Sequence, residues 1–288
     1  MNKFQDLGNR EITAGGKWGL AGFFLASGMA VFFLGGYFTG FSPLIRTVFK
    51  AGLPVLFLGI TLVFRRHDHW RRYWRLSFAF FAASLGFLVA WLFSDALVSL
   101  LNISSQTMAG LALTKLVDAV LIILPILVVV ALVEGNQGGL YIRGGRLRTS
   151  LWIGGASFLI LAVVFYCLAR QQGIGGNQLL RWSPWILVFV LSNAFLEELH
   201  FRGLFLSRLA RFLGRGWANV LVAVVFTLVH VPVEYTPDII PFLAVLFVLA
   251  LLWGALIQRT QSLWGAVLFH AGADLLIIIE ILNGFRRS

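Results

Sequence analysis

A short polar segment, Glu-Glu-Leu-His-Phe-Arg-Gly at residues 197–203, lies inside an apolar run that extends from about residue 185 to residue 206. Ionisable side chains at membrane depth are costly, and by default they indicate a functional site. Two later apolar runs each contain a histidine, in the segments 226–230 and 270–274. We therefore predict that three helices bring these polar residues together around one hydrolytic site.

Helical spacing assigns different roles to the two adjacent glutamates. Glu198 and Arg202 are four residues apart and share a helix face, so that Arg202 can hold Glu198 ionised and offset part of its burial cost. Glu197 is rotated by about 100° and is free to face a cavity. His200 lies three residues after Glu197, and the sequence does not decide whether it supports Glu197 or faces the lipid headgroups.

The two histidine segments supply the remaining groups that acid–base chemistry needs. His270 and Asp274 are four residues apart and share a face. A glutamate flanked by His230 and His270 can take a proton from water, and the resulting hydroxide can attack a carbonyl carbon. The histidines can then stabilise the oxyanion or pass a proton to the leaving amine. Alternatively, two histidines and a carboxylate can bind zinc with a water as the fourth ligand, and the spacing alone does not choose between these mechanisms.

Functions other than hydrolysis also fit these residue types. Intramembrane Glu, His and Asp chains relay protons in transporters, so a proton-coupled transporter or a non-catalytic immunity protein is the alternative. Three polar clusters within a hundred residues argue against a purely structural role. Lys115 and Asp118 stand apart from these clusters, and their spacing of three residues predicts a structural pair on one helix face.

The composition places these residues in a membrane protein. The chain has 288 residues, of which 59% are hydrophobic and 12% are charged, with a mean hydropathy of +0.87. Soluble domains average about 25% charged residues. The repeated apolar runs predict an all-α, polytopic transmembrane helix bundle of about 8–9 spans in a lipid bilayer. The single cysteine, Cys167, allows no intrachain disulfide.

Nine apolar runs are candidate spans, and eight is the alternative count. The second run is the weakest, because Arg46, Lys50 and Pro54 interrupt it, and the seventh is short. The runs cover residues 18–41, 44–64, 76–101, 112–133, 151–169, 183–206, 217–232, 239–257 and 262–282.

Basic residues predict the orientation of the bundle. The chain carries a formal charge of +11, and its basic residues concentrate in the segments 65–75, 143–148 and 208–215. These segments share one side if the spans alternate, and the positive-inside rule makes that side cytoplasmic, so that nucleic acid is not needed to explain the charge. The loop with Glu234 and Asp238 falls on the other side. Because the third basic segment closely follows residues 197–203, we expect the site to open toward the cytoplasmic half of the bilayer.

The ordered motifs resemble a known family. Glu197-Glu198 with Arg202, then Phe226 with His230, then His270 with Asp274, on successive helices, is similar to the CPBP family, which comprises CAAX prenyl proteases and bacteriocin-processing enzymes and is also called the ABI family. The resemblance covers about residues 183–282. We accordingly divide the chain into accessory transmembrane helices at 1–180 and a catalytic transmembrane core at 181–288.

The resemblance implies an intramembrane endopeptidase that cleaves a membrane-associated peptide or protein, which in this family includes prenylated and bacteriocin-like substrates. Glu197 would activate water with His230 as its partner, Glu198 and Arg202 would form the pair of the first motif, and His270 and Asp274 would stabilise the oxyanion or bind a metal. The compact size and short loops favour the cytoplasmic membrane of a prokaryote.

Overall fold

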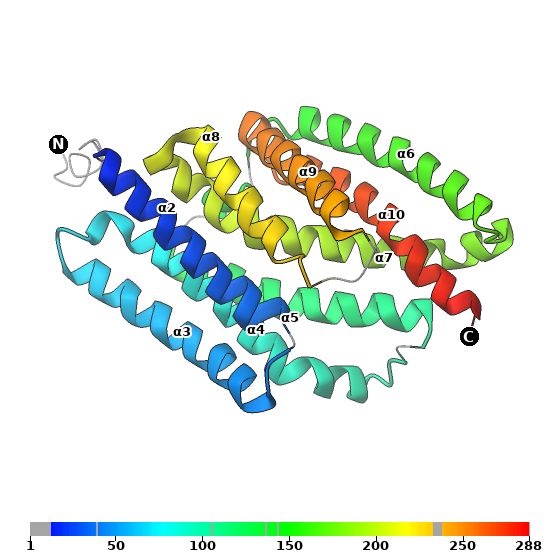
Figure 1. Cartoon of the computed structure of the whole chain (residues 1–288), viewed down its shortest axis with the longest axis horizontal. Coiled ribbons are helices and arrows are strands. Elements are labelled where there is room, and N and C mark those ends of the chain that lie inside the picture. Colours follow the sequence, from blue (N-terminus) through cyan, green and yellow to red (C-terminus); the bar gives the residue numbers. More distant parts are fainter. Residues whose placement is uncertain are drawn as a thin grey trace.

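The computed structural model describes residues 13–38, 40–104, 106–135, 137–142, 144–232 and 238–287, and every regular element in these ranges is helical. Figure 1 shows the helices packed side by side as an elongated bundle, with the start of α2 and the end of α10 at opposite ends of the view. Arg143 and Glu234, which entered the orientation argument, lie outside the described residues.

The elements follow one another without strands in the described ranges. They are α2 (Ala14–Gly28), η1 (Met29–Tyr37), α3 (Pro43–Arg66), η2 (Arg71–Tyr73), α4 (Trp74–Leu100), α5 (Met108–Glu134), η3 (Gln137–Leu140), α6 (Leu147–Gln171), α7 (Gly176–Glu197), η4 (Glu198–Gly203), α8 (Leu204–Leu228), α9 (Ile239–Thr260) and α10 (Trp264–Arg287). Within the described part of the chain, eight continuous helical stretches are long and apolar enough to cross a membrane. This confirms the predicted multi-pass helical bundle.

One of these stretches contains two passes rather than one. Gly176–Leu228 is 53 residues long, whereas a helix of about 20 residues crosses the hydrocarbon core. At Gly214 the backbone leaves the helical region with φ 78° and ψ 165°, and Figure 1 shows α8 turning back at its upper left end. A positive φ is available to glycine at little cost. The turn separates the predicted sixth and seventh spans.

The interrupted second span forms a continuous helix, α3, in spite of its polar residues. Lys50 donates a hydrogen bond from Nζ to the carbonyl of Gly35 at 3.0 Å, which gives the ammonium a partner on the neighbouring element η1. Pro54 lies inside the helix and is buried. Neighbouring helices make prolines tolerable within a membrane span.

Contacts between distant segments show that the three predicted basic segments lie at one end of the bundle, which we call the basic end. The ring of Tyr73 lies 5.2 Å from that of Phe212. Arg208 pairs with Glu134 at 2.7 Å, and the amide of Arg146 donates to the carbonyl of Thr260 at 2.6 Å. The three predicted basic segments therefore do share a side.

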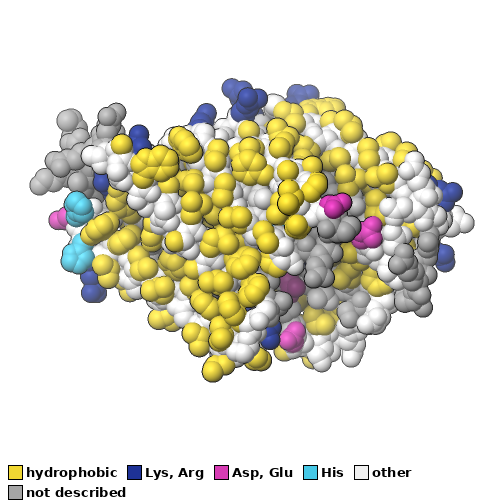
Figure 2. Space-filling view, in the orientation of Figure 1, with side chains coloured by type: hydrophobic (Ala, Val, Ile, Leu, Met, Phe, Trp, Pro, Cys, Tyr) yellow, Lys and Arg dark blue, Asp and Glu magenta, His cyan; other side chains and the backbone are white. Residues whose placement is uncertain are grey.

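The opposite end of the bundle is defined in the same way. The amide of Asn283, near the end of α10, donates a hydrogen bond to the side chain of Gln172, which follows α6. Figure 2 shows hydrophobic side chains over the middle of one face, most of the basic side chains toward its margins, and a few acidic side chains to the right of the centre. Exposed leucines such as Leu132, at 80% exposure, fit contact with lipid chains rather than water.

Close contact between glycines packs α10, which carries two predicted site residues, against α6. A Cβ added to Gly154 would lie 2.2 Å from the carbonyl oxygen of Gly265, so neither backbone tolerates a side chain there. The amide of Gly265 donates to Oγ of Ser150 at 2.9 Å. Small residues that allow backbones to approach are a common means of packing helices in membranes.

Candidate active site

The two adjacent glutamates lie at a change of helical geometry. Glu197 ends α7, and Glu198–Gly203 form a single π-helical turn before α8 begins. All six residues of this turn are buried. Single π-helical turns inside longer helices often coincide with functional sites. Glu197 and Glu198 contact opposite nitrogens of the same ring, that of His270.

Glu198 links two basic side chains through one carboxylate oxygen. Its Oε1 lies 2.9 Å from Nη1 of Arg202 and accepts a hydrogen bond of 2.8 Å from Nδ1 of His270. The predicted pair with Arg202 is therefore present, and the side chains of both residues are fully buried. The sequence assigned Glu198 to this ion pair alone. The structure adds a second contact, because Glu198 also fixes the ring of His270.

Aromatic rings surround this ion pair and exclude water from it. The guanidinium of Arg202 lies 4.2 Å from the ring centroid of Phe226 and 5.4 Å from that of Trp253. The ring of His270 stacks on Trp253 at 3.9 Å, with an angle of 8° between the planes. Cation–π contacts of this kind strengthen when the charge is desolvated. Trp253 is 1% exposed and serves as a platform for both basic groups.

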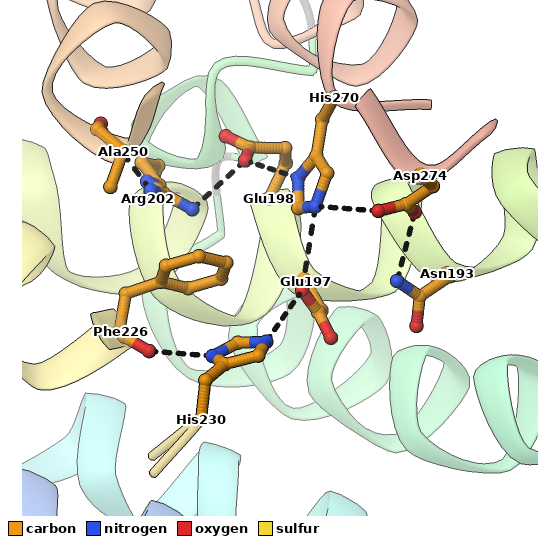
Figure 3. Close-up of polar contacts among 9 residues, drawn as sticks. All are labelled: Asn193, Glu197, Glu198, Arg202, Phe226, His230, Ala250, His270 and Asp274. Atoms are coloured by element: carbon orange, nitrogen blue, oxygen red, sulfur yellow. Dashed lines mark hydrogen bonds and ion pairs between the residues drawn. The ribbon is translucent and has the colours of Figure 1, made fainter. Parts of the chain in front are cut away.

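Glu197 faces both histidines, as Figure 3 shows. Its Oε2 lies 3.5 Å from Nε2 of His270 and 3.9 Å from Nε2 of His230. The predicted convergence of Glu197, His230 and His270 from α7, the end of α8 and α10 is therefore present. The carboxylate is 7% exposed and borders a cavity.

Hydrogen bonds on the far side of each ring determine which nitrogen faces Glu197. Nδ1 of His230 lies 2.7 Å from the carbonyl oxygen of Phe226, which can only accept, so Nδ1 carries a proton. Nε2 of His230 then faces the cavity. Nδ1 of His270 donates to Glu198, and its Nε2 faces two carboxylates, Glu197 and Asp274. Since carboxylates accept hydrogen bonds, a proton on Nε2 of His270 satisfies both contacts.

Asp274 completes the group and has a partner of its own. Its Oδ1 lies 3.5 Å from Nε2 of His270, and its Oδ2 accepts a hydrogen bond of 3.0 Å from Nδ2 of Asn193. Asn193 precedes Glu197 by four residues on α7. The amide therefore orients the carboxylate across the interface between α7 and α10.

His200 does not join the site, and neither role considered for it from the sequence is right. Its ring is fully buried between those of Phe32 and Phe87, at 4.8 Å and 4.7 Å. Its Nε2 lies 3.2 Å from the carbonyl oxygen of Ala83. The π-helical turn directs this side chain toward η1 and α4 instead of toward Glu197 or the headgroups.

The cavity beside the glutamate has a volume of about 350 Å³. Most of its lining is apolar. The charged, histidine and amide side chains that line it are Lys115, Asn193, Glu197, His230, His270 and Asp274. The side chains that line it are Lys115, Leu161, Phe189, Asn193, Glu197, His230, Phe242, Val245, Leu246, Leu249, Trp253, His270, Ala273, Asp274, Leu276, Ile277, Ile278 and Ile281. Lys115 and Leu161 belong to the region before residue 180, so that region contributes walls to the cavity.

The cavity extends away from the basic end of the bundle. It is lined by Phe242 near the start of α9, by Lys115 in the first third of α5 and by Ile281 in the last third of α10. These parts of the three helices lie toward the opposite end, because Glu134, Thr260 and Trp264 mark their basic ends. Under the positive-inside rule this direction points away from the cytoplasm, opposite to the one expected from the third basic segment, and the side on which the cavity opens stays a prediction.

Among the described residues, a second hollow and the arrangement of metal-binding side chains also bear on the site. A larger hollow of about 600 Å³, bordered by residues such as Leu124, Leu151 and Trp264, contains no ionisable side chain and lies apart from the glutamates. No group of three or more His, Cys, Asp or Glu side chains in the described part of the chain is arranged to hold a metal ion.

Three residues that contact the site or line its cavity were not predicted from the sequence to belong to it. Asn193 carried a signal, because it is a polar residue four positions before Glu197 and therefore on the same helix face. Lys115 was predicted to form a structural pair with Asp118 on one helix face. Trp253 carried no signal, because a tryptophan in an apolar helix is ordinary.

Comparison with known proteins identifies the part of the chain that carries this geometry. Residues 179–276 match the model of the family described as "Type II CAAX prenyl endopeptidase Rce1-like". The matched stretch is about a third of the chain and contains Glu197, Arg202, His230, His270 and Asp274. No curated protein and no solved structure is similar enough to the chain to count as a match. The family match confirms the resemblance seen in the motifs.

Proposed function

We propose that the chain, whose residues 179–276 form an Rce1-like CAAX endopeptidase domain, hydrolyses a peptide bond of a membrane-associated substrate with water activated by Glu197. The observation that carries this proposal is the position of Glu197 at the edge of a cavity, with Nε2 of two histidines directed at one of its oxygens. A carboxylate so placed is suited to accept a proton from water.

The first step forms the tetrahedral intermediate. Because Nδ1 of His230 donates to the carbonyl of Phe226, Nε2 is the acceptor nitrogen of the neutral ring and orients the attacking water beside Glu197. Glu197 removes a proton from that water, and the oxygen attacks the carbonyl carbon of the substrate. His270, protonated on Nε2, donates to the oxyanion that forms. Preorganised donors of this kind are a large source of rate acceleration.

The second step breaks the carbon–nitrogen bond. Glu197 passes the proton that it took from water to the leaving nitrogen, which departs as an amine, and the other product ends in a new carboxyl group. Glu198, Arg202 and Asp274 do not exchange protons in this scheme. They fix the orientation of His270 through the contacts of 2.8 Å with Glu198 and 3.5 Å with Asp274.

The membrane supplies the environment for this chemistry. The apolar lining of the cavity suits a substrate segment with apolar side chains, and the eight apolar helical stretches of the described residues support a cavity within a bilayer. A prokaryotic cytoplasmic membrane is the location that we propose, because the basic end then faces the cytoplasm.

Replacement of Glu197 by Gln tests the proposal directly. The purified full chain, reconstituted in liposomes, is incubated with a pool of internally quenched apolar peptides. We expect Glu197→Gln to lower the cleavage rate by about 10³-fold, because general-base catalysis typically contributes 10²- to 10⁴-fold. Glu280→Gln removes an exposed carboxylate from α10 and is the matched control, with unchanged cleavage.

Cleavage that persists in Glu197→Gln would reject this mechanism. Failure of the wild-type protein to cleave any peptide in the pool would reject the proposed activity. Metal analysis of the same preparation separates glutamate from zinc: a stoichiometric zinc ion whose removal abolishes cleavage would make a metal-bound water, rather than a water activated by Glu197, the nucleophile.

A further inference from the structure

Lys115 is a cation inside the catalytic cavity that the proposed mechanism does not use. It lies on α5, is partly buried and lines the cavity together with Glu197, His230, His270 and Asp274. Its position, seven residues after the start of α5, sets it in the half of the cavity away from the basic end. A charged side chain within a membrane span is a functional-site hypothesis by default.

The partner expected from the sequence does not neutralise Lys115. Asp118 lies three residues later, but its Oδ1 accepts a hydrogen bond from Oγ of Ser94 on α4. Among the described residues, no carboxylate oxygen lies within 4 Å of the Lys115 ammonium. The ammonium lies over the ring of Phe189, whose centroid is 5.6 Å from Nζ.

An ammonium in this setting favours an anionic ligand. The ring of Phe189 attracts the charge only weakly compared with a carboxylate, because a cation–π contact contributes about 0.5–2 kcal/mol. The carboxylates that line the cavity, Glu197 and Asp274, both contact His270. A ligand with a negative group beside Lys115 would neutralise the ammonium, which no described carboxylate does.

We propose that Lys115 binds a carboxylate of the substrate peptide and thereby positions the scissile bond at Glu197. This inference rests on the proposed peptidase function. The carboxylate can be the C-terminal one or that of an acidic side chain, because both present the same group to an ammonium.

The spacing along α7 predicts where that carboxylate lies in the substrate. Phe189, which contacts Lys115, precedes Glu197 by eight residues (197 − 189 = 8). At 1.5 Å per residue this is about 12 Å along the helix. An extended peptide covers about 3.3 Å per residue. The carboxylate therefore lies about three or four residues from the bond that is cut.

Binding of labelled peptides to the inactive Glu197→Gln protein tests this without cleavage. The probes are an N-terminally dansylated apolar hexapeptide with a free C-terminus, its C-terminal amide, and the amide with one glutamate placed four residues before the end. We expect the free acid, the glutamate peptide or both to bind about tenfold tighter than the plain amide. Introduction of Lys115→Met should abolish this difference, and Lys115→Arg should retain part of it.

Lys17→Met is the matched control, because it removes the same charge from an exposed position on α2. It should leave the preference for the carboxylate unchanged. Equal binding of all three probes, or a preference that survives Lys115→Met, would overturn the proposal. Dioctanoyl phosphatidic acid is added as a competitor. Lys115-dependent binding of this lipid without any preference among the peptides would assign the site to a lipid phosphate and would also overturn the proposal.

The two proposals fail separately. If the wild-type protein cleaves peptides but binds acid and amide probes equally, the role of Lys115 is rejected and the peptidase stands. If no peptide is cleaved but the Lys115-dependent preference persists, the anion site stands and the peptidase is rejected.

Discussion

Nδ1 of His270 on α10 donates a hydrogen bond of 2.8 Å to Oε1 of Glu198, the first residue of the π-helical turn η4. The same oxygen lies 2.9 Å from Arg202. One carboxylate thus neutralises a buried guanidinium and sets the ring that faces Glu197. Stability and the geometry of the site depend on the same atom, so the two adjacent glutamates should respond differently to substitution.

Glu198→Gln should destabilise the protein, whereas Glu197→Gln should not. Removal of one partner of a buried ion pair leaves an uncompensated charge and costs about 3–5 kcal/mol. We expect a lower midpoint of thermal unfolding in detergent for Glu198→Gln only. In the double variant Glu198→Gln, Arg202→Met both charges are absent, so most of the loss should be recovered. A double variant as unstable as the sum of its single changes would contradict the coupling of this pair.

The stacking of His270 on Trp253 predicts a graded effect of substitution on activity. Trp253→Phe keeps an aromatic face beside both basic groups, whereas Trp253→Leu removes it. We expect kcat/KM to fall about tenfold further in Trp253→Leu than in Trp253→Phe, since each stacking contact contributes on the order of 1 kcal/mol. Peptide hydrolysis by the two purified variants measures this. Equal rates would show that the ring fills space without orienting His270.

The glycine contact between α6 and α10 gives a prediction with an adjacent control. In Gly154→Ala the new Cβ meets the backbone of Gly265, so the helices must separate, at a cost of about 1–3 kcal/mol. Gly155→Ala adds the same methyl group where nothing lies within 4 Å. It should leave stability unchanged or raise it slightly, because alanine favours a helix. Thermal unfolding of both variants is the measurement, and equal midpoints would contradict the close approach.

The direction of the cavity predicts from which side of the membrane a water-soluble reagent reaches the site. Cys167 is the only cysteine, so Cys167→Ser provides a background free of thiols. In that background Val245→Cys lines the cavity, and Gly216→Cys lies at the basic end beside Trp217. We expect a membrane-impermeant maleimide to label Val245→Cys in intact bacterial cells and Gly216→Cys only after permeabilisation. The reverse pattern would place the opening of the cavity on the cytoplasmic side.

Local patterns determined much of this protein in advance. Apolar runs close to the thickness of a bilayer predicted the helical bundle, because backbone groups in lipid must be satisfied within each helix. Spacing of four residues predicted the contacts of Glu198 with Arg202 and of His270 with Asp274, since such residues share a helix face whatever the rest of the fold does. Charges in apolar runs indicated the candidate site residues.

Only the tertiary structure decided how these faces meet. The bond between Glu198 and His270, the platform of Trp253 and the burial of His200 depend on contacts between helices that are distant in sequence, and no local period encodes them. The same holds for the cavity, whose walls include residues of α5, α9 and α10, and for Asp118, whose Oδ1 accepts a hydrogen bond from Ser94 on another helix.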